Sequence, residues 1–394
     1  MKIAAEDLRF MGYRRPDGSI GIRNHTLIIP SVVCANRVAR GISQQVQGTV
    51  WVEHQHGCSQ VGLDAKRTAE VLVGHGTNPN VAGVVVVGLG CETVRAQDIA
   101  SAIQERCPWK LVKVILIQEA GGSYKAIAAG AAAAQLMVQA SSLLNREPID
   151  AKELILGTEC GGSDACSGIS ANPALGSASD LLIDAGGTVL LAETPELIGA
   201  EHLVAARAVS PEVARRCYEV IERRESEAKA TGFDMRGGNP TPGNIAGGIS
   251  TIEEKSLGCV YKGGSRPLQD VIEYGETIIK KGLIWMDTPG NDIEQLTGMV
   301  AGGCHIVVFT TGRGTPTGSA IVPTVKVSTN TAMFQKMQES MDINAGTIIA
   351  GDETVLQVGR RIFAEILAVA SGKLTKAEIL GQNDFGINRI GPTL

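Results

Sequence analysis

The chain has 394 residues, with 36 basic and 41 acidic side chains and a net charge of −5. This length gives room for two or three domains, and the mildly acidic balance provides no basic surface for nucleic acid or anionic lipid. No apolar run is long enough to cross a membrane and no charged, apolar leader opens the sequence, which predicts a cytoplasmic protein. Nine cysteines in so long a chain exclude a small disulfide scaffold.

Short β-branched runs alternate with amphipathic stretches along the whole chain. Strands are predicted at residues 26–33, 49–52, 84–87, 113–117, 154–156, 188–191, 283–286, 306–309 and 324–327. Helices are predicted between them, at residues 38–46, 65–73, 96–105, 124–140, 172–183, 211–228, 292–300 and 354–370. Nearly continuous apolar strands that alternate with helices predict parallel sheets covered on both faces.

The alternation predicts an α/β protein with two Rossmann-like parallel-sheet domains. A polar break at residues 145–151 predicts a first domain over residues 1–148 and a second over residues 149–394. A Gly-, Pro- and Asn-rich loop region at residues 232–250 is expected to be an insertion in the second domain, either an active-site loop or a hinge. The site is expected between the domains, at the carboxyl ends of the strands.

Polar, glycine-rich loops follow most of the predicted strands. In open parallel sheets, ligands bind outside the carboxyl ends of the strands, where helix amino termini also point. One such loop is ordinary in an α/β protein, but several that reach the same edge predict one composite site. These loops are residues 54–58, 88–92, 118–122, 159–164, 193–196, 287–290 and 310–315.

Three cysteines lie in these loops, each beside a glycine: Cys58, Cys91 and Cys160. Thiolates suit iron or zinc, and three ligands leave one coordination position open for substrate. The set fits a mononuclear Fe²⁺ as well as a three-cysteine iron–sulfur cluster, and inert buried thiols are the other interpretation. Cys166 is ambiguous. The remaining cysteines are interpreted as core or incidental residues: Cys34, Cys107, Cys217, Cys259 and Cys304.

Candidate acid–base residues accompany the same loops. His54 and His56 would face one ligand if their segment is extended, and a histidine pair that caps a loop fits equally well. Imidazole titrates near neutral pH, so either ring is a candidate base or acid. Glu92, Asp164 and Glu193 are further catalytic candidates, with the orientation of metal ligands as the alternative role.

An anion-binding site is predicted from one arginine in a glycine-rich loop. Arg313 and Thr315 offer a guanidinium and a hydroxyl that suit a carboxylate or phosphate, and a plain surface turn is the alternative. Lys326, next to a strand end, supplies a second cation, and Asn244 supplies an amide. The Glu-Glu-Lys run at residues 253–255 is interpreted as solvated helix charge.

Longer motifs resemble the altronate/galactarate dehydratase family. The sequence contains no GxGxxG or P-loop motif of a dinucleotide- or ATP-binding enzyme and no Gly-x-Ser-x-Gly nucleophile motif. The resemblance covers essentially the whole chain and implies an iron-dependent lyase that dehydrates a sugar acid to a 2-keto-3-deoxy acid. The matching motifs are residues 10–18, 21–24, 56–58, 78–80, 88–92, 160–164, 167–176, 193–196, 242–244, 252–258, 286–290, 310–314 and 341–346.

The resemblance also implies an assembly. In full-length enzymes of this family a small amino-terminal domain precedes the region that matches, whereas here the match begins at residue 10. We therefore expect a large subunit that binds a separate small subunit and forms a homo-oligomer of large subunits. The related (2R)-sulfolactate sulfo-lyase large subunit is likewise split. That branch lacks cysteines matching Cys58 and Cys91, so their presence favours a dehydratase.

The predicted chemistry is an α,β-elimination from a small hydroxy acid. A base removes the proton α to the carboxylate, and a metal and fixed cations stabilise the enediolate while the β-hydroxyl leaves. We assign iron to Cys58, Cys91 and Cys160, and Arg313 to the substrate carboxylate; the resemblance implies that these loops take part but gives no individual roles. Two alternatives stay open: a sulfo-lyase that releases sulfite from (2R)-3-sulfolactate, and a non-catalytic protein that binds iron or an anion.

Overall fold

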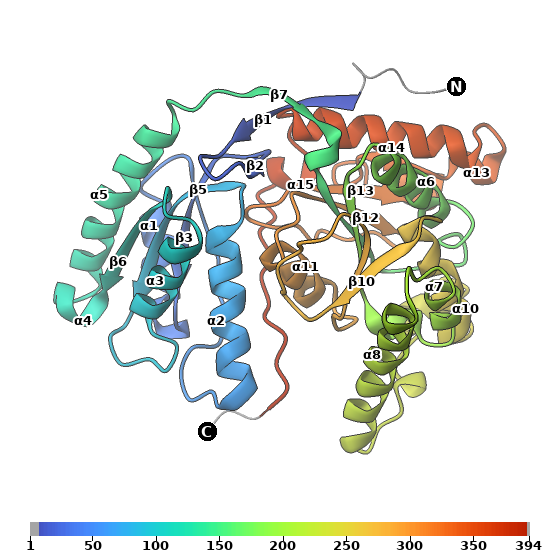
Figure 1. Cartoon of the computed structure of the whole chain (residues 1–394), viewed down its shortest axis with the longest axis horizontal. Coiled ribbons are helices and arrows are strands. Elements are labelled where there is room, and N and C mark those ends of the chain that lie inside the picture. The colour runs from blue at the N-terminus through green and yellow to red at the C-terminus, as the bar shows by residue number, and fades with distance from the viewer. Residues whose placement is uncertain (1–7, 392–394) are drawn as a thin grey trace.

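The first part of the chain forms a four-stranded parallel sheet in the order β4–β3–β5–β6 (Figure 1). The computed structural model describes residues 8–391. The strands are β3 (His25–Pro30), β4 (Thr49–Trp51), β5 (Val81–Gly88) and β6 (Leu111–Leu116). The helices are α1 (Asn36–Ser43), α2 (Gly62–Thr77), α3 (Ala96–Arg106), α4 (Ile117–Ala120) and α5 (Ser123–Ser141).

The second part forms a seven-stranded parallel sheet in the order β10–β11–β9–β8–β12–β13–β14. Its strands are β8 (Ile155–Cys160), β9 (Thr188–Leu191), β10 (Leu268–Ile272), β11 (Gly282–Met286), β12 (Ile306–Thr311), β13 (Thr324–Ser328) and β14 (Ile343–Asn344). The longer helices are α6 (Ala171–Asp184), α8 (Pro211–Ala230), α10 (Ile252–Cys259), α11 (Asp292–Ala301) and α14 (Val355–Ala370). Shorter helices are α7 (Glu201–Ala205), α9 (Pro242–Ala246), α12 (Thr331–Lys336), α13 (Thr347–Ala350) and α15 (Lys376–Ile379).

The prediction of an α/β protein with parallel sheets is confirmed. Each predicted strand overlaps a strand of the structure, and the central strands are buried along their whole length because helices cover both faces. None of the helices within residues 8–391 is long and apolar enough to span a bilayer.

A small antiparallel sheet, β2–β1–β7, connects the two parts and was not predicted. β1 (Arg9–Arg14) pairs with β2 (Ile20–Gly21) on one side and with β7 (Glu147–Asp150) on the other. Two ion pairs follow the β1–β7 ladder, Arg9 to Asp150 and Arg14 to Glu147. The polar break at residues 145–151 therefore contains a strand, and the division of the chain at residue 148 stays a prediction.

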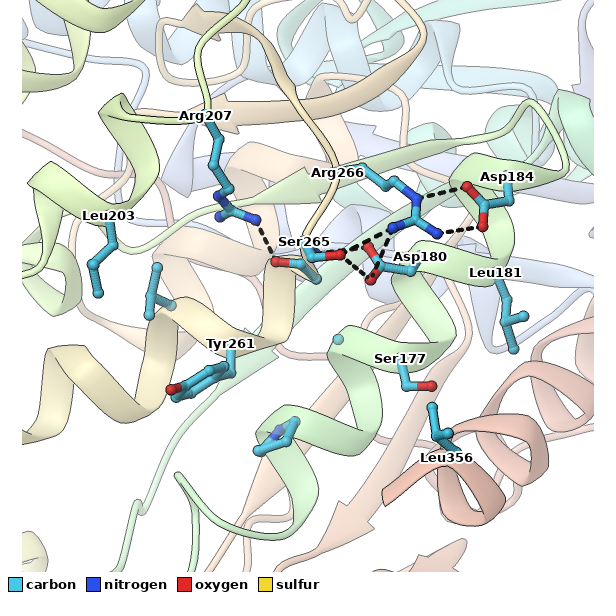
Figure 2. Close-up of a pocket in the computed structure, with 14 residues that line it drawn as sticks. Ser177, Asp180, Leu181, Asp184, Leu203, Arg207, Tyr261, Ser265, Arg266 and Leu356 are labelled. Atoms are coloured by element: carbon cyan, nitrogen blue, oxygen red, sulfur yellow. Dashed lines mark hydrogen bonds and ion pairs between the residues drawn. The ribbon is translucent and has the colours of Figure 1, made fainter. Parts of the chain in front are cut away.

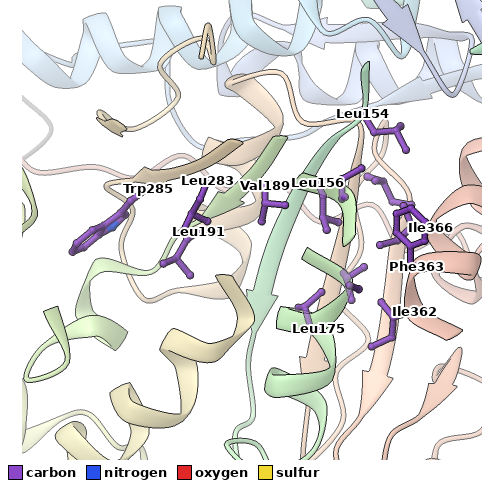
Figure 3. Close-up of a cluster of buried hydrophobic side chains, with 14 of the residues drawn as sticks. Leu154, Leu156, Leu175, Val189, Leu191, Leu283, Trp285, Ile362, Phe363 and Ile366 are labelled. Atoms are coloured by element: carbon purple, nitrogen blue, oxygen red, sulfur yellow. The ribbon is translucent and has the colours of Figure 1, made fainter. Parts of the chain in front are cut away.

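The hydrophobic core of the seven-stranded sheet lies under α6 and α14 (Figure 3). Leu156, Val189 and Leu283 point from the sheet toward Leu175 of α6 and Ile362 of α14, and all are fully buried. A second core joins the two parts of the chain, because α2 packs against α11 between the sheets. The two sheets therefore form one packed body.

The Asn-Pro-Asn turn after α2 links the two parts by hydrogen bonds. Asn80 Nδ2 donates to the carbonyl oxygens of His305 (2.9 Å) and Ile321 (3.0 Å), and its Oδ1 accepts from Ile22 N at 2.8 Å. Asn78 Nδ2 donates to two further carbonyls of the second part, at 3.0 and 3.1 Å. Both side chains are buried with their amides paired, so this motif is structural.

Candidate active site

The carboxyl edge of the seven-stranded sheet carries a buried group of reactive side chains. Cys160 is the last residue of β8, and Glu193 follows β9, the neighbouring strand. Glu193 adopts a left-handed backbone conformation with φ 66°, which is uncommon for a residue with a side chain, and Thr288 Oγ1 accepts its N–H at 2.7 Å. Strained backbone of this kind is found where surrounding structure must aim a functional group.

We name Cys160, Glu193, Glu196, Cys259 and Lys262 the thiol–carboxylate cluster. Glu196 lies in the 3-10 helix Thr194–Leu197, and Lys262 in the 3-10 helix Val260–Gly263 after α10. The Cys160 and Cys259 sulfurs lie 3.3 Å apart and donate to Glu196 Oε2 at 3.1 and 2.9 Å. Lys262 Nζ donates to Cys160 Sγ at 3.0 Å and forms an ion pair with Glu193. All five side chains are buried.

The two carboxylates of the cluster titrate in opposite directions. Burial raises the pKa of Glu193 to about 8, with a further contribution from the charge of Glu196. Burial also opposes ionisation of Glu196, but Lys255 and Lys262 outweigh it and lower the pKa of Glu196. The hydrogen bond with Cys259, together with burial, raises the pKa of Cys160 well above that of an ordinary thiol. Carboxyl groups whose pKa values are pushed apart suit a division into acid and base.

The donor atoms of the cluster fit a metal ion. Cys160, Glu196 and Cys259 offer two sulfurs and a carboxylate oxygen within 4.8 Å of one another. Sulfur ligands with a carboxylate suit iron or zinc, and binding would take the protons from both thiols. A second group, Glu159, Glu193 and Asp292, also meets this distance.

A cavity of about 290 Å³ adjoins the cluster. Lys255, Cys259 and Asp164 line it together with Ser167 and Tyr261. Lys255 is buried and forms an ion pair with Glu196, so the cavity leads directly to the cluster. A small polar substrate in this cavity would meet an ammonium, a thiol and a carboxylate.

Asp164 and Asn244, two predicted site residues, hold the loop after β8. Asp164 accepts hydrogen bonds from Thr329 Oγ1 at 2.9 Å and from Asn330 Nδ2 at 3.0 Å. Asn244 Nδ2 donates to Ser163 O at 3.0 Å, and its Oδ1 completes a capping box at the start of α9. Both residues therefore lie at the carboxyl edge of the sheet, and Asp164 also faces the cavity.

The predicted anion-binding residues differ in how exposed their side chains are. Arg313 N donates to Gly162 O at 2.9 Å, which brings its loop to the loop after β8, and its side chain is exposed. Thr315 is buried and donates to Thr317 Oγ1 at 2.9 Å. Lys326 is fully buried, donates to Gln382 Oε1, and has a pKa that burial lowers to about 8.

His54 and His56 lie at the edge of the other sheet. Their rings stack with centroids 6.2 Å apart, beside a cavity of about 470 Å³ that Glu294 and Arg389 also line. His54 Nε2 contacts Pro30 O at 2.7 Å, and its Nδ1 accepts from His56 N at 3.1 Å. Burial lowers the pKa of His54 to about 4. The pair faces the carboxyl-terminal segment of the chain, since His56 Nε2 lies 3.3 Å from Ile387 O.

Cys58, Cys91 and Glu92 also lie at the edge of the four-stranded sheet. Both cysteines are exposed, and Glu92 is buried, where it accepts from Ser31 Oγ at 2.8 Å and from Gly90 N at 2.7 Å. Neither of the two metal-capable groups found in residues 8–391 contains Cys58 or Cys91. The structure therefore gathers Cys160 with Cys259 and Glu196, and not with the other two predicted ligands.

The interpretation of Lys255 as solvated was wrong, because it is buried against Glu196. Cys259, interpreted as core or incidental, is buried, and it also contacts Cys160 and Glu196. Both were missed because they lie on a helix and not in a loop after a strand. A signal was present: Lys255, Cys259 and Lys262 follow the spacing i, i+4, i+7, which places them on one helical face.

A larger, mostly apolar cavity of about 550 Å³ lies elsewhere in the second part (Figure 2). Leu181, Leu203 and Tyr261 line it, and Arg266 pairs with Asp184 at 2.5 Å. Arg266 pairs with Asp180 and Asp184, Arg207 donates to Gly264 O, and no thiol of residues 8–391 lines the cavity. The chemistry therefore points to the smaller cavity at the thiol–carboxylate cluster.

Together, the parallel sheets and the buried acid–base and thiol groups at a strand edge define an α/β enzyme. Residues 12–142 match the family model for the second domain of D-galactarate dehydratase/altronate hydrolase, and residues 151–393 match that for the C-terminal domain of D-galactarate/altronate dehydratase. The chain belongs to the D-galactarate/altronate dehydratase family, and the resemblance of its motifs is confirmed.

Relatives of known activity agree. The chain is 39% identical to an altronate dehydratase of Bacillus subtilis, over 99% of this chain and 79% of the relative. It is 37% identical to a galactarate dehydratase (L-threo-forming) of Escherichia coli, over 93% of this chain and 74% of the relative. It is also 36% identical to the (2R)-sulfolactate sulfo-lyase subunit beta of Chromohalobacter salexigens, over 97% of each chain. The protein is a lyase.

Proposed function

We propose that this lyase dehydrates a sugar acid, an aldonate or aldarate such as altronate or galactarate, to a 2-keto-3-deoxy acid. The observation that carries the proposal is the thiol–carboxylate cluster, which borders a cavity lined by Asp164 and Lys255 in a chain 39% identical to an altronate dehydratase. Elimination of water needs one group to take the α proton and another to protonate the leaving hydroxyl.

The residues around the cavity suit these tasks. Glu193, with its raised pKa, gives a proton to the leaving hydroxyl, and Asp164, which lines the cavity, takes the α proton. Lys255 at the cavity wall and Arg313 on the adjacent loop hold the substrate carboxylates. Acid–base roles for His54, His56 and Glu92, and anion-binding roles for Asn244, Thr315 and Lys326, stay predictions of the sequence.

Iron is the proposed metal, held by Cys160, Cys259 and Glu196. When bound, it supplies Lewis-acid stabilisation of the negative charge that develops on the substrate. A ligand role for Cys58 and Cys91, in a mononuclear site or a three-cysteine iron–sulfur cluster, stays a prediction. Iron and sulfide analysis of anaerobically purified protein distinguishes a single ion from a cluster.

A substrate panel tests the proposed reaction. We expect the anaerobically purified protein to form a 2-keto acid from an aldonate or aldarate, with no free sulfite from (2R)-3-sulfolactate. Release of sulfite without keto acid from any sugar acid would instead establish a sulfo-lyase. The near-equal length of the sulfo-lyase relative favours this second candidate. Stoichiometric iron with no turnover would indicate a binding protein.

We also propose that the chain binds a separate small subunit and forms a homo-oligomer of large subunits. One relative is the beta subunit of a (2R)-sulfolactate sulfo-lyase, which supports a subunit partner. Co-purification of a tagged chain from its native host, followed by measurement of the mass of the complex, tests both parts of the proposal.

A further inference from the structure

The Asp164 carboxylate lies where the loops after β8, β12 and β13 meet. Within its own loop, after β8, Ser167 Oγ donates to Asp164 Oδ1 at 3.0 Å. From the loop after β13, Thr329 Oγ1 donates to Oδ1 at 2.9 Å and Asn330 Nδ2 donates to Oδ2 at 3.0 Å. Uncharged donors from two loops therefore set the orientation of this carboxylate at the edge of the cavity.

Asn330 joins the three loops through its side chain. Its Nδ2 donates to Gly312 O, in the loop after β12, at 3.1 Å as well as to Asp164. Its Oδ1 accepts from Met333 N at 2.8 Å and so caps the amino end of α12. Both polar atoms of the amide are used, which fixes the side chain between Asp164 and the loop after β12.

Gly312 leaves room for the Asp164 carboxylate. A Cβ at position 312 would lie 2.2 Å from Asp164 Cγ and 2.4 Å from its Oδ1. Arg313, the next residue, donates its N–H to Gly162 O at 2.9 Å and has an exposed side chain. The backbone that carries Arg313 is therefore packed directly against the carboxylate of Asp164.

Removal of an α proton makes a geometric demand on these loops. The carbon that loses the proton is bonded to the carboxylate carbon, so the base and the group that holds the carboxylate must keep a fixed separation. A misplacement of about 1 Å can lower the rate roughly a hundredfold. In the proposed function Asp164 is the base and Arg313 holds a carboxylate, and Asn330 bonds to the loops of both.

We propose that Asn330 is a positioning residue, which fixes Asp164 relative to the loop of Arg313 so that the base meets the α proton of the bound acid. This inference rests on the proposed function and adds to it a residue that acts through another. The cavity wall formed by residues 8–391 includes Asp164 but not Asn330, so Asn330 orients the base without touching the substrate.

Steady-state kinetics of Asn330→Ser test the positioning role. Serine caps a helix about as well as asparagine, so α12 keeps its start, but a serine hydroxyl cannot reach Asp164 and Gly312 together. With altronate or galactarate, whichever the wild type dehydrates, we expect kcat to fall at least about tenfold while KM stays within about twofold. The isotope effect of deuterium at the α carbon should rise, because removal of the proton becomes slower.

Three further variants distinguish positioning of the base from other effects. Asn291→Ser, the same change at the exposed N-cap of α11, is the matched control and should keep wild-type kinetics. Arg313→Ala should show the opposite pattern, a raised KM, because it removes a group that holds the substrate. Gly312→Ala, whose Cβ displaces Asp164 from the loop after β12, should repeat the fall in kcat and provides the test if Asn330→Ser does not fold.

An unchanged kcat in Asn330→Ser, or a raised KM at unchanged kcat, would overturn the inference. A lower kcat with an unchanged isotope effect would also overturn it, because loss of folded enzyme lowers the rate without slowing the proton step. Asp164→Asn separates these results from a failure of the proposed function. If it is inactive while Asn330→Ser behaves as the wild type, only the positioning role is wrong. Turnover in Asp164→Asn would refute the proposed base and the positioning role together, and no keto acid from the wild type would refute the proposed reaction.

Discussion

Cys259 is the residue on which the proposed iron site depends most. Its sulfur lies 3.3 Å from that of Cys160, and a serine hydroxyl there would be a poor ligand for iron. Mutation of a residue that only hydrogen-bonds to a metal ligand lowers metal affinity or activity by roughly 10- to 100-fold. We expect Cys259→Ser, which removes a ligand itself, to lower iron affinity and turnover by more than that. Iron per chain and the rate of keto-acid formation are the measurements.

Cys217→Ser is the control, since Cys217 is buried in α8 and donates only to Val213 O. It should keep its iron. Cys91→Ser decides between the two ligand sets: loss of iron there with full iron in Cys259→Ser would favour the set predicted from the strand-end loops and refute the one gathered in the structure.

The sequence could reveal the part of the site that follows strands and not the part on helices. Cys160 and Glu193 were predicted because parallel strands deliver their ends to one edge. Lys255 and Cys259 were missed because a helix presents its residues to core or solvent depending on neighbours that only the folded chain provides. Lys255 and Lys262 flank Cys259 at helical spacing. Their role becomes clear only from the folded structure, in which they pair with buried carboxylates.

At the scale of elements, the central parallel strands were predictable and the small antiparallel sheet was not. Central strands are mostly apolar because both of their faces are covered and buried, and this pattern is visible locally. β1 and β7 are short, charged and half exposed, and each is stable only because it pairs with the other from a distant part of the sequence. A local sequence pattern does not show which distant segment a strand pairs with.

The junction of β8 and β12 should make the stability of the fold depend on pH. His305 Nδ1 accepts the Ile155 N–H at 3.1 Å, which requires a neutral ring, and burial lowers the pKa of His305 to about 4. Between that value and the unfolded value of about 6.5, the unfolded chain binds the extra proton, so stability is lost as pH falls. We expect this histidine to cost about 2 kcal/mol of unfolding free energy at pH 5 relative to pH 7.

Urea unfolding of His305→Asn at both pH values checks the assignment. The asparagine oxygen can accept the same N–H without titrating, so the variant should be less stable at pH 7 but lose less stability on acidification. Part of the pH dependence will remain, because burial also lowers the pKa values of His25, His54 and His75 to about 4. An unchanged difference between pH 7 and pH 5 would contradict the role given to His305.

At the scale of the whole molecule, the two sheets are held together by a few buried amides as well as by packing. Asn80 uses its whole side chain in this contact, with two carbonyls of the second part accepting from Nδ2 and Ile22 N donating to Oδ1. Asn80→Asp removes both donors and buries a negative charge without changing the size of the side chain. We expect a loss of roughly 3 kcal/mol in unfolding free energy.

The loss should also change how the molecule unfolds. The wild type shares a hydrophobic core between α2 and α11, so its two sheets should unfold in one transition. In Asn80→Asp the contact between the parts is weakened while the core inside each part is unchanged, so calorimetry should show a broadened or split transition. Asn145→Asp, the same change at an exposed position, should leave a single transition at the wild-type temperature. Equal melting temperatures for Asn80→Asp and Asn145→Asp would show that packing alone joins the sheets. The new carboxylate at residue 80 would then be hydrated and would not weaken the contact.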